Sequence, residues 1–250
     1  MSPPSSTRVL AVDPEAPDAD ALAEAARVLA RGGLVAFATE TVYGLGAVAT
    51  DANAVARIFA AKGRPSVNPL IVHVADVGQA GECVADWPDA ADRLAGRFWP
   101  GPLTLVLRRS GRIPDIVTAG KATVGVRWPA GKVARGLIAG CGRPVAAPSA
   151  NRSNRLSPTR AEHVLADLDG RIDLVLDSGP TAFGLESTVL DLTDDPPRLL
   201  RPGPIAVKDL EAALGGPLAV PETGSSSDRP TSPGQMPVHY SPRTPAFRVD

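Results

Sequence analysis

The sequence predicts an α/β domain built on a mixed β-sheet. Segments with helical periodicity alternate along the chain with short, wholly apolar segments typical of strands covered on both faces. The 250-residue chain contains 44% hydrophobic residues, enough to bury the core of one large domain. After Gly215 the composition shifts to Pro, Gly and Ser, which is typical of a linker that follows a folded domain.

The first elements expected are a helix, a strand and a second helix. PDADALAEAARVLARGG has apolar residues at helical spacing, and either Asp18 or Asp20 can cap it. The pair Gly32-Gly33 ends this helix, and the apolar LVAFAT follows as a buried strand. A second helix starts at Asp51 and stops at Gly63. Further strands are expected in LIVHV, LTLVLR, TVGVRW, PVAAP, LVLDSG and STVLDL, and further helices near residues 88–98, 131–140, 159–168 and 207–214.

Charge and cysteine content indicate which partners and which redox environment to expect. The formal net charge is -1, so no overall field favours nucleic acid or a membrane surface. Cys83 and Cys141 form no disulfide framework and are expected as reduced thiols, which favours a cytoplasmic protein. No apolar run approaches the roughly 20 residues of a membrane span, so no membrane partner is expected. Residues 1–8 are expected to form a flexible N-terminal arm.

Several familiar catalytic patterns do not occur in the sequence. His73, His163 and His239 lie far apart without the spacing of metal ligands, so no metal site made by the protein alone is expected. No G-x-S-x-G nucleophile motif occurs. GVRWPAGK departs from a P-loop, because five residues separate its glycines and Val133 stands where Ser or Thr is needed. GLGAVA is interpreted as glycines at a tight strand connection.

Basic and amide side chains gather in loops at the ends of predicted strands. Lys62, Arg64 and Asn68 lie in or beside a Pro-punctuated loop before LIVHV. Arg127 ends another strand, Arg201 precedes a turn, and APSANRSNRLSPT is a loop rich in hydroxyl and amide groups. Each cation alone is more often a solvated surface residue. Together they predict a site for an anion such as a polyphosphate, because lysine offers a point charge and arginine a two-pronged donor.

Six ordered motifs resemble the YrdC-like family, most closely its two-domain members, the L-threonylcarbamoyladenylate synthases. The motifs are TETVYGLGAVATD, KGRPSVNPLIVHV, TVGVRWP, APSANRSNRLSPT, GLESTVLDL and LLRPG, and they extend over most of residues 8–215. SPGQMPVHYSP resembles the segment that follows the catalytic domain in the longer synthases. Those members continue into a further C-terminal domain, whereas this sequence ends at Asp250.

The resemblance implies a twisted sheet with flanking helices that form a concave, positively lined cavity. It places a catalytic domain at residues 9–215 and a linker or lid at residues 216–250. The implied activity joins L-threonine, bicarbonate or CO2, and ATP into threonylcarbamoyl-AMP and pyrophosphate. Other proteins then transfer the threonylcarbamoyl group to tRNA.

Carried over by position, the resemblance assigns two groups of binding residues. L-Threonine would be held by Thr41, His73, Arg127, the backbone at Ala147, and Ser187. ATP would be held by Arg64, Asn68, Thr123, Ser149, Ser157, Arg201 and Tyr240, with Lys62 beside the triphosphate. Lys62 and Arg64 would be the catalytic pair, because they neutralise a triphosphate that another anion must attack.

The implied reaction also predicts a cofactor, a base and a lid. Mg2+ would be bound chiefly by the substrate phosphates. His73 is a candidate general base by its ordinary pKa range, although a hydrogen-bonded histidine at a strand edge is an equal alternative. His239 and Tyr240 would work in a lid that shields reactive intermediates from water, the alternative being a Pro-rich tail without a fixed position.

Two other functions remain open from the sequence. YrdC-like domains also occur in carbamoyltransferases that act through a carbamoyl-adenylate, so another carbamoyl-adenylating activity is one alternative. The other is an RNA-binding module without catalysis. The near-neutral charge predicts only weak RNA binding, because such binding depends on a basic face and counterion release.

Overall fold

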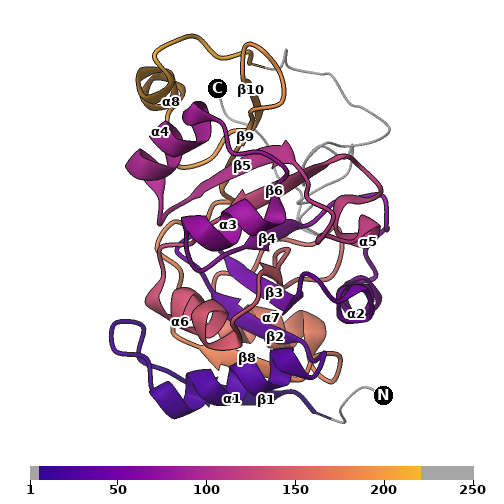
Figure 1. Cartoon of the computed structure of the whole chain (residues 1–250). Coiled ribbons are helices and arrows are strands. Elements are labelled where there is room, and N and C mark those ends of the chain that lie inside the picture. Colours follow the sequence, from indigo (N-terminus) through magenta and orange to yellow (C-terminus); the bar gives the residue numbers. More distant parts are fainter. Residues whose placement is uncertain (1–5, 221–250) are drawn as a thin grey trace.

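The computed structural model describes residues 6–220, and its described strands form one ten-stranded sheet. The strand order is β1-β8-β2-β3-β7-β4-β6-β5-β9-β10, which runs from the bottom to the top of Figure 1. Parallel and antiparallel pairs alternate irregularly, so the sheet is mixed, as expected. The strands are β1 (Arg8–Ala11), β2 (Val35–Ala38), β3 (Tyr43–Val48), β4 (Ile71–His73), β5 (Leu103–Arg108), β6 (Thr123–Arg127), β7 (Val145–Ala146), β8 (Leu174–Asp177), β9 (Thr188–Asp191) and β10 (Arg198–Arg201).

Helices flank the sheet, and several begin and end at the signals expected from the sequence. The helices are α1 (Ala19–Ala30), α2 (Ala52–Lys62), α3 (Val77–Cys83), α4 (Asp89–Phe98), α5 (Asp115–Thr118), α6 (Lys132–Cys141), α7 (Ala161–Leu168) and α8 (Val207–Leu214). Asp18, one of the two candidate caps, accepts a hydrogen bond from the N–H of Ala21. Asp51 caps α2, and Gly63 ends it in the left-handed conformation.

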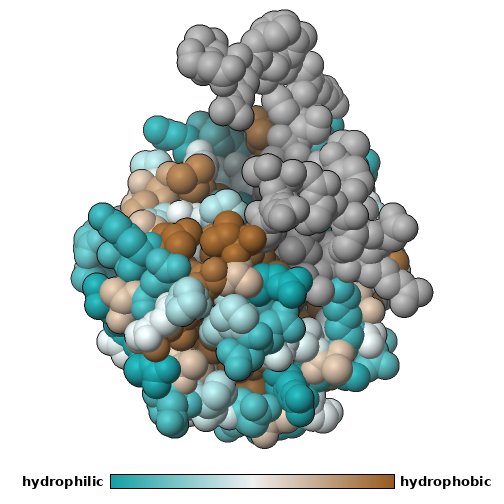
Figure 2. All heavy atoms as spheres, turned by 90° about the horizontal axis from the view of Figure 1, so that it is seen from above, coloured by the Kyte–Doolittle hydropathy of each residue, from teal (hydrophilic) through white to brown (hydrophobic). Residues whose placement is uncertain are grey.

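Two large apolar clusters and a small third one, of Val106, Val189 and Leu200, form the core. The largest lies between the sheet and helices that include α2, α4 and α7. The second lies under α1 and α6 and contains residues of β2, β3, β7 and β8. Its residues from the sheet include none from β4, β5 or β6, and the ends of β4 and β6 carry His73 and Arg127. The outer surface is mostly hydrophilic, with some apolar side chains near the centre of the view in Figure 2.

The structure contains elements that the sequence analysis did not predict. Arg8, assigned to the N-terminal arm, begins β1, which pairs with β8. The strand β10 and the short helices α3 and α5 were also missed. These elements are short, and the edge strands β1 and β10 have only four residues each, too few to show a periodic apolar pattern.

The interpretation of GLGAVA as a tight strand connection was wrong, because both of its glycines, Gly44 and Gly46, lie inside β3. Phe37 pairs opposite Gly44 across β2 and β3. A Cβ atom at Gly46 would lie 2.8 Å from Cε1 of Phe37, so glycine leaves room for that ring. The glycines therefore serve close packing within the sheet.

Residues 216–220, assigned to the linker, partly return to the domain. The carbonyl oxygen of Ala219 accepts a hydrogen bond from the N–H of Leu199, and the N–H of Ala219 donates to the carbonyl of Pro197. The remainder of the expected lid, including His239 and Tyr240, lies outside the described residues. No helix within residues 6–220 combines the length and apolar character needed to span a bilayer.

Candidate functional site

A small cavity opens beside the ends of β4 and β6. All five residues assigned to L-threonine line it, together with three of those assigned to ATP. They are Thr41, His73, Arg127, Ala147 and Ser187, and Arg64, Ser149 and Arg201. Residues from six separate sequence motifs therefore meet at one place.

Strand register explains how the polar side chains of this cavity come together. His73 and Arg127 are the last residues of β4 and β6, and they pair directly across these parallel strands. Paired residues on neighbouring strands point to the same face. On that face Ile71 pairs with Gly125, which has no side chain to fill the space between Ile71 and Thr104. The sheet thus forms a floor with polar groups at the strand ends.

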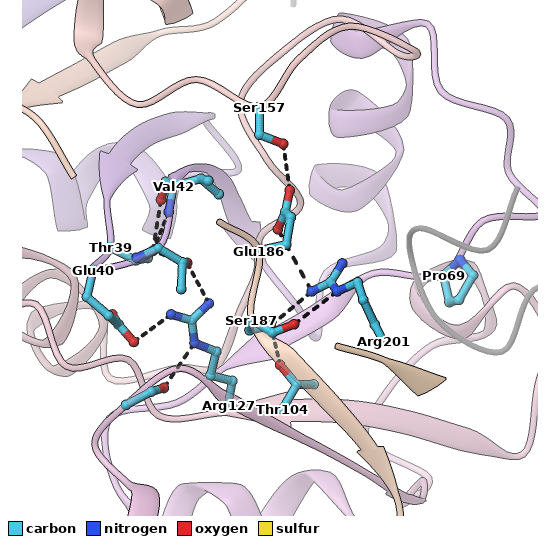
Figure 3. A network of polar contacts seen from close by, with 12 residues as sticks. Thr39, Glu40, Val42, Pro69, Thr104, Arg127, Ser157, Glu186, Ser187 and Arg201 are labelled. Atoms are coloured by element: carbon cyan, nitrogen blue, oxygen red, sulfur yellow. Dashed lines mark hydrogen bonds and ion pairs between the residues drawn. The ribbon is translucent and has the colours of Figure 1, made fainter. Parts of the chain in front are cut away.

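The Arg127 guanidinium is held by three neighbours in a nearly buried position. Its Nε donates to the carbonyl of Gly101 at 3.2 Å, and its Nη1 donates to Oγ1 of Thr41 at 3.0 Å. Its Nη2 forms an ion pair with Oε1 of Glu40 at 2.6 Å, as Figure 3 shows. The other carboxylate oxygen of Glu40 accepts the N–H of Ala130. A guanidinium has five N–H donors, so two remain for a ligand carboxylate.

His73 is a neutral imidazole within this cavity. Only 4% of the residue is exposed, and burial, followed by the charge of Arg127, lowers the pKa of His73 to about 3. Its Nδ1 atom is buried and has no hydrogen-bond partner among the described residues. A histidine with such a low pKa is a weak base near neutral pH. His73 is therefore better suited to binding a polar ligand group than to removing a proton.

A second group of polar contacts extends from Ser187 to Ser157 (Figure 3). Nη2 of Arg201 donates to Oγ of Ser187 at 2.9 Å, and Nε of Arg201 donates to the Ser187 carbonyl at 3.0 Å. Arg201 also pairs with Glu186 at 3.8 Å, and the hydroxyl of Ser157 donates to that carboxylate at 2.6 Å. Ser157 is thus linked to the cavity through Glu186.

Lys62 lies behind the loop that begins at Ser149. Its Nζ donates to the carbonyl of Ser149 at 2.5 Å and to the carbonyl and side-chain oxygens of Asn151. Only 2% of the residue is exposed, and burial, followed by the charge of Arg64, lowers its pKa. The structure therefore gives Lys62 a backbone-holding role that the sequence did not predict. Its contact with a triphosphate stays a prediction.

The other residues assigned to ATP occupy different surroundings. Arg64 lines the cavity and donates from Nη2 to the carbonyl of Pro69 at 3.0 Å. Asn68 is 4% exposed, and its Oδ1 has no partner among the described residues. Thr123 begins β6 at the end opposite Arg127, about 13 Å away along the strand. An extended ligand is needed to reach both ends of this strand.

Glu40 and Glu186 are the carboxylates of the site, and the sequence analysis did not single them out. Each stands directly beside a predicted ligand residue, Glu40 before Thr41 and Glu186 before Ser187. Both pair with an arginine that had been assigned to a substrate. A buried arginine needs an acidic partner, so an acidic residue next to a predicted ligand residue could have indicated Glu40 and Glu186.

This arrangement offers hydrogen-bond donors to two negatively charged groups. Arg127 lies at one end of the cavity, and Arg64 and Arg201 lie elsewhere in its lining. A single small cavity with several guanidinium groups can hold two anions close together and reduce their repulsion. Among residues 6–220 no group of three His, Cys, Asp or Glu side chains could hold a metal ion without help from a ligand.

Comparison with known proteins identifies the family. A family model described as "Telomere recombination" (Sua5_yciO_yrdC) matches residues 27–203. A threonylcarbamoyl-AMP synthase of Pyrococcus abyssi is 49% identical over 227 residues, which are 90% of this chain and 67% of that protein. The Bacillus subtilis threonylcarbamoyl-AMP synthase is 50% identical over 226 residues, which are 90% of this chain and 65% of that protein.

Solved structures of the same family are also similar to this chain. The crystal structure of P. abyssi Sua5 complexed with L-threonine matches with a TM-score of 0.91 and 47% identity, covering 94% of this chain and 69% of that one. The structure of Escherichia coli YciO matches with a TM-score of 0.74 at 25% identity. The chain therefore belongs to the Sua5/YciO/YrdC family, which confirms the family resemblance and the expected fold. It spans about two thirds of the length of the curated relatives it matches.

Proposed function

We propose that this chain makes threonylcarbamoyl-AMP and pyrophosphate from L-threonine, bicarbonate or CO2, and ATP. The observation that carries this proposal is that all five residues assigned to binding L-threonine line one cavity together with Arg64 and Arg201. The relatives that share about half of its residues bear the name threonylcarbamoyl-AMP synthase. The product would pass to proteins that transfer the threonylcarbamoyl group to tRNA.

The amino acid would bind at the Arg127 end of the cavity. The free N–H groups of Arg127 suit its carboxylate, and Thr41 fixes the guanidinium that presents them. The neutral His73 offers an uncharged nitrogen to a polar group of the substrate. The nonpolar lining at Val42, Ile71 and Ala147 suits the methyl group of L-threonine.

The reaction joins two anions, so charge neutralisation and alignment are the main requirements. The neutral amine of L-threonine forms an N–C bond with CO2 and releases a proton, which gives the carbamate. With bicarbonate the same N–C bond forms, a C–O bond of bicarbonate breaks, and water leaves. A carbamate oxygen then bonds to the α-phosphorus of ATP, and the bond to pyrophosphate breaks. Arg64 and Arg201 would hold the phosphates in line with that oxygen, with Lys62 supporting the loop at Ser149.

Mg2+ is proposed as the cofactor, held chiefly by the phosphates of ATP. When bound, the ion would neutralise phosphate charge. The carboxylate of Glu186 lies in the cavity lining between Ser157 and Arg201 and is the group available to meet the ion or its water. The thiols of Cys83 and Cys141 are free, which supports the proposal of a cytoplasmic, reducing environment.

The test is pyrophosphate release by this 250-residue chain with ATP and Mg2+. L-Threonine and bicarbonate are added separately and together. Release only with both supports the proposal. Release with carbamoyl phosphate in place of both would instead favour the other carbamoyl-adenylating activity. Steeply salt-dependent RNA binding without any turnover would favour the RNA-binding module.

A further inference from the structure

Thr104 contacts the proposed substrate site from inside the sheet. It lies on β5 and is completely buried. Its Oγ1 lies 2.8 Å from Oγ of Ser187, as Figure 3 shows, and this is its only hydrogen-bond partner among residues 6–220. Its methyl group lies towards Gly125, where a Cβ atom would approach it to 3.2 Å. The absence of that side chain leaves room for the methyl group and for the hydroxyl to face Ser187.

Hydrogen-bond accounting fixes the direction of this contact. A buried hydroxyl that does not donate leaves its hydrogen unsatisfied, which is unfavourable. Within residues 6–220, the only acceptor that Thr104 Oγ1 reaches is Oγ of Ser187. Thr104 is therefore the donor, and Oγ of Ser187 is the acceptor.

Ser187 receives a second donor from Arg201. Nη2 of Arg201 lies 2.9 Å from the same Oγ, and a guanidinium cannot accept. With two donors bound, both lone pairs of the Ser187 oxygen are occupied. Its own hydrogen remains, and Ser187 lines the cavity. Towards a ligand in the cavity, this hydroxyl can only donate.

We propose that Thr104 is a positioning residue that makes Ser187 a dedicated hydrogen-bond donor to a negatively charged oxygen of the amino-acid substrate. This inference rests on the proposed function. The oxygen belongs to the carboxylate of L-threonine or to the carbamate formed from it. The ammonium group is excluded, because it offers only donors.

The experiment is a double-mutant cycle on the whole chain, with Thr104→Val, Ser187→Ala and the double variant. Pyrophosphate release gives kcat and KM for L-threonine, and calorimetry without bicarbonate gives the threonine Kd. Thr104→Val is expected to lower kcat/KM about fivefold, because Ser187 loses one of the donors that hold and polarise it. Ser187→Ala is expected to lower it more, and the double variant should match Ser187→Ala. Thr104→Ser should retain wild-type values.

Comparing the threonine Kd with kcat identifies the substrate oxygen that accepts the hydrogen bond from Ser187. A weaker threonine Kd in Thr104→Val assigns the donor to the carboxylate, whereas an unchanged Kd with a lower bicarbonate-dependent kcat assigns it to the carbamate. Wild-type kinetics in Thr104→Val, or an equal loss in the Ser187→Ala background, would overturn the inference. Thr104→Ala provides a second variant if the valine protein fails to fold. A wild-type chain without threonine-dependent pyrophosphate release would refute the proposed function itself.

Discussion

Arg127 and Glu40 form a nearly buried ion pair, with 2.6 Å between Nη2 and Oε1 and side chains that are 4% and 9% exposed. The pair joins the end of β6 to the turn between β2 and β3. Glu40 strengthens this connection by also accepting the N–H of Ala130. A buried guanidinium without such a partner would pay a large desolvation cost. Glu40 thus stabilises the buried guanidinium of Arg127 in the cavity when no substrate carboxylate is bound.

Glu40→Ala should destabilise the fold, because it leaves the charge of Arg127 buried without its partner. The expected loss in the free energy of unfolding is about 3 kcal/mol, measured by urea denaturation. Glu82→Ala is the matched control, since Glu82 pairs with Arg112 where both side chains are more than half exposed. That control should lose less than about 1 kcal/mol. Equal losses in the two variants would contradict this account of Glu40.

Arg64→Ala should weaken the use of ATP while leaving the fold intact. Arg64 lines the cavity from a loop, so its removal costs a contact with phosphate rather than core packing. The expected fall in kcat/KM for ATP is about 30-fold, the value of one hydrogen bond to a charged group. Arg31→Ala removes an exposed arginine after α1 and serves as the control. Wild-type ATP kinetics in Arg64→Ala would remove this residue from the phosphate site.

Lys62→Met should reduce stability as well as activity. Methionine preserves much of the side-chain volume but leaves the carbonyl groups of Ser149 and Asn151 without their donor. The expected loss is about 2–4 kcal/mol in the free energy of unfolding. Hydrogen exchange of the backbone amides at residues 149–153 should accelerate in the same variant. If Lys62→Met were as stable as the wild type and lost only ATP affinity, a direct phosphate role would be the better account.

The burial of His73 predicts a loss of stability in acid. Its pKa is about 3 in the folded protein against an ordinary value of 6.5, so the unfolded chain binds the proton more readily. The stabilising contribution is present above pH 6.5 and falls as the pH drops towards 3, by about 1.4 kcal/mol per pH unit. Urea denaturation at a series of pH values measures this slope.

His73→Gln should flatten that slope between pH 6.5 and pH 4. His163→Gln, the same substitution at an exposed histidine, is the control. An unchanged slope in His73→Gln would show that His73 is accessible to protons in the folded state.

Local sequence signals predicted the elements with strong patterns. Helices capped by Asp18 and Asp51 and strands such as LTLVLR appear where expected, because capping and continuous apolar runs act over a few residues. The edge strands β1 and β10 were missed because segments of four residues are too short to show a periodic apolar pattern. The glycines of GLGAVA were misplaced because their role depends on Phe37 across the sheet.

By itself the sequence determined the fold class, the family and the set of candidate ligand residues, because ordered motifs are a property of the chain. Only the tertiary structure decided what each residue contacts. It placed Lys62 behind the Ser149 loop, paired Arg127 with Glu40, and set Thr104 against Ser187. These partners are 87 residues apart in the first two pairs and 83 in the third. Strand order and register bring them together, and neither can be derived from a local pattern.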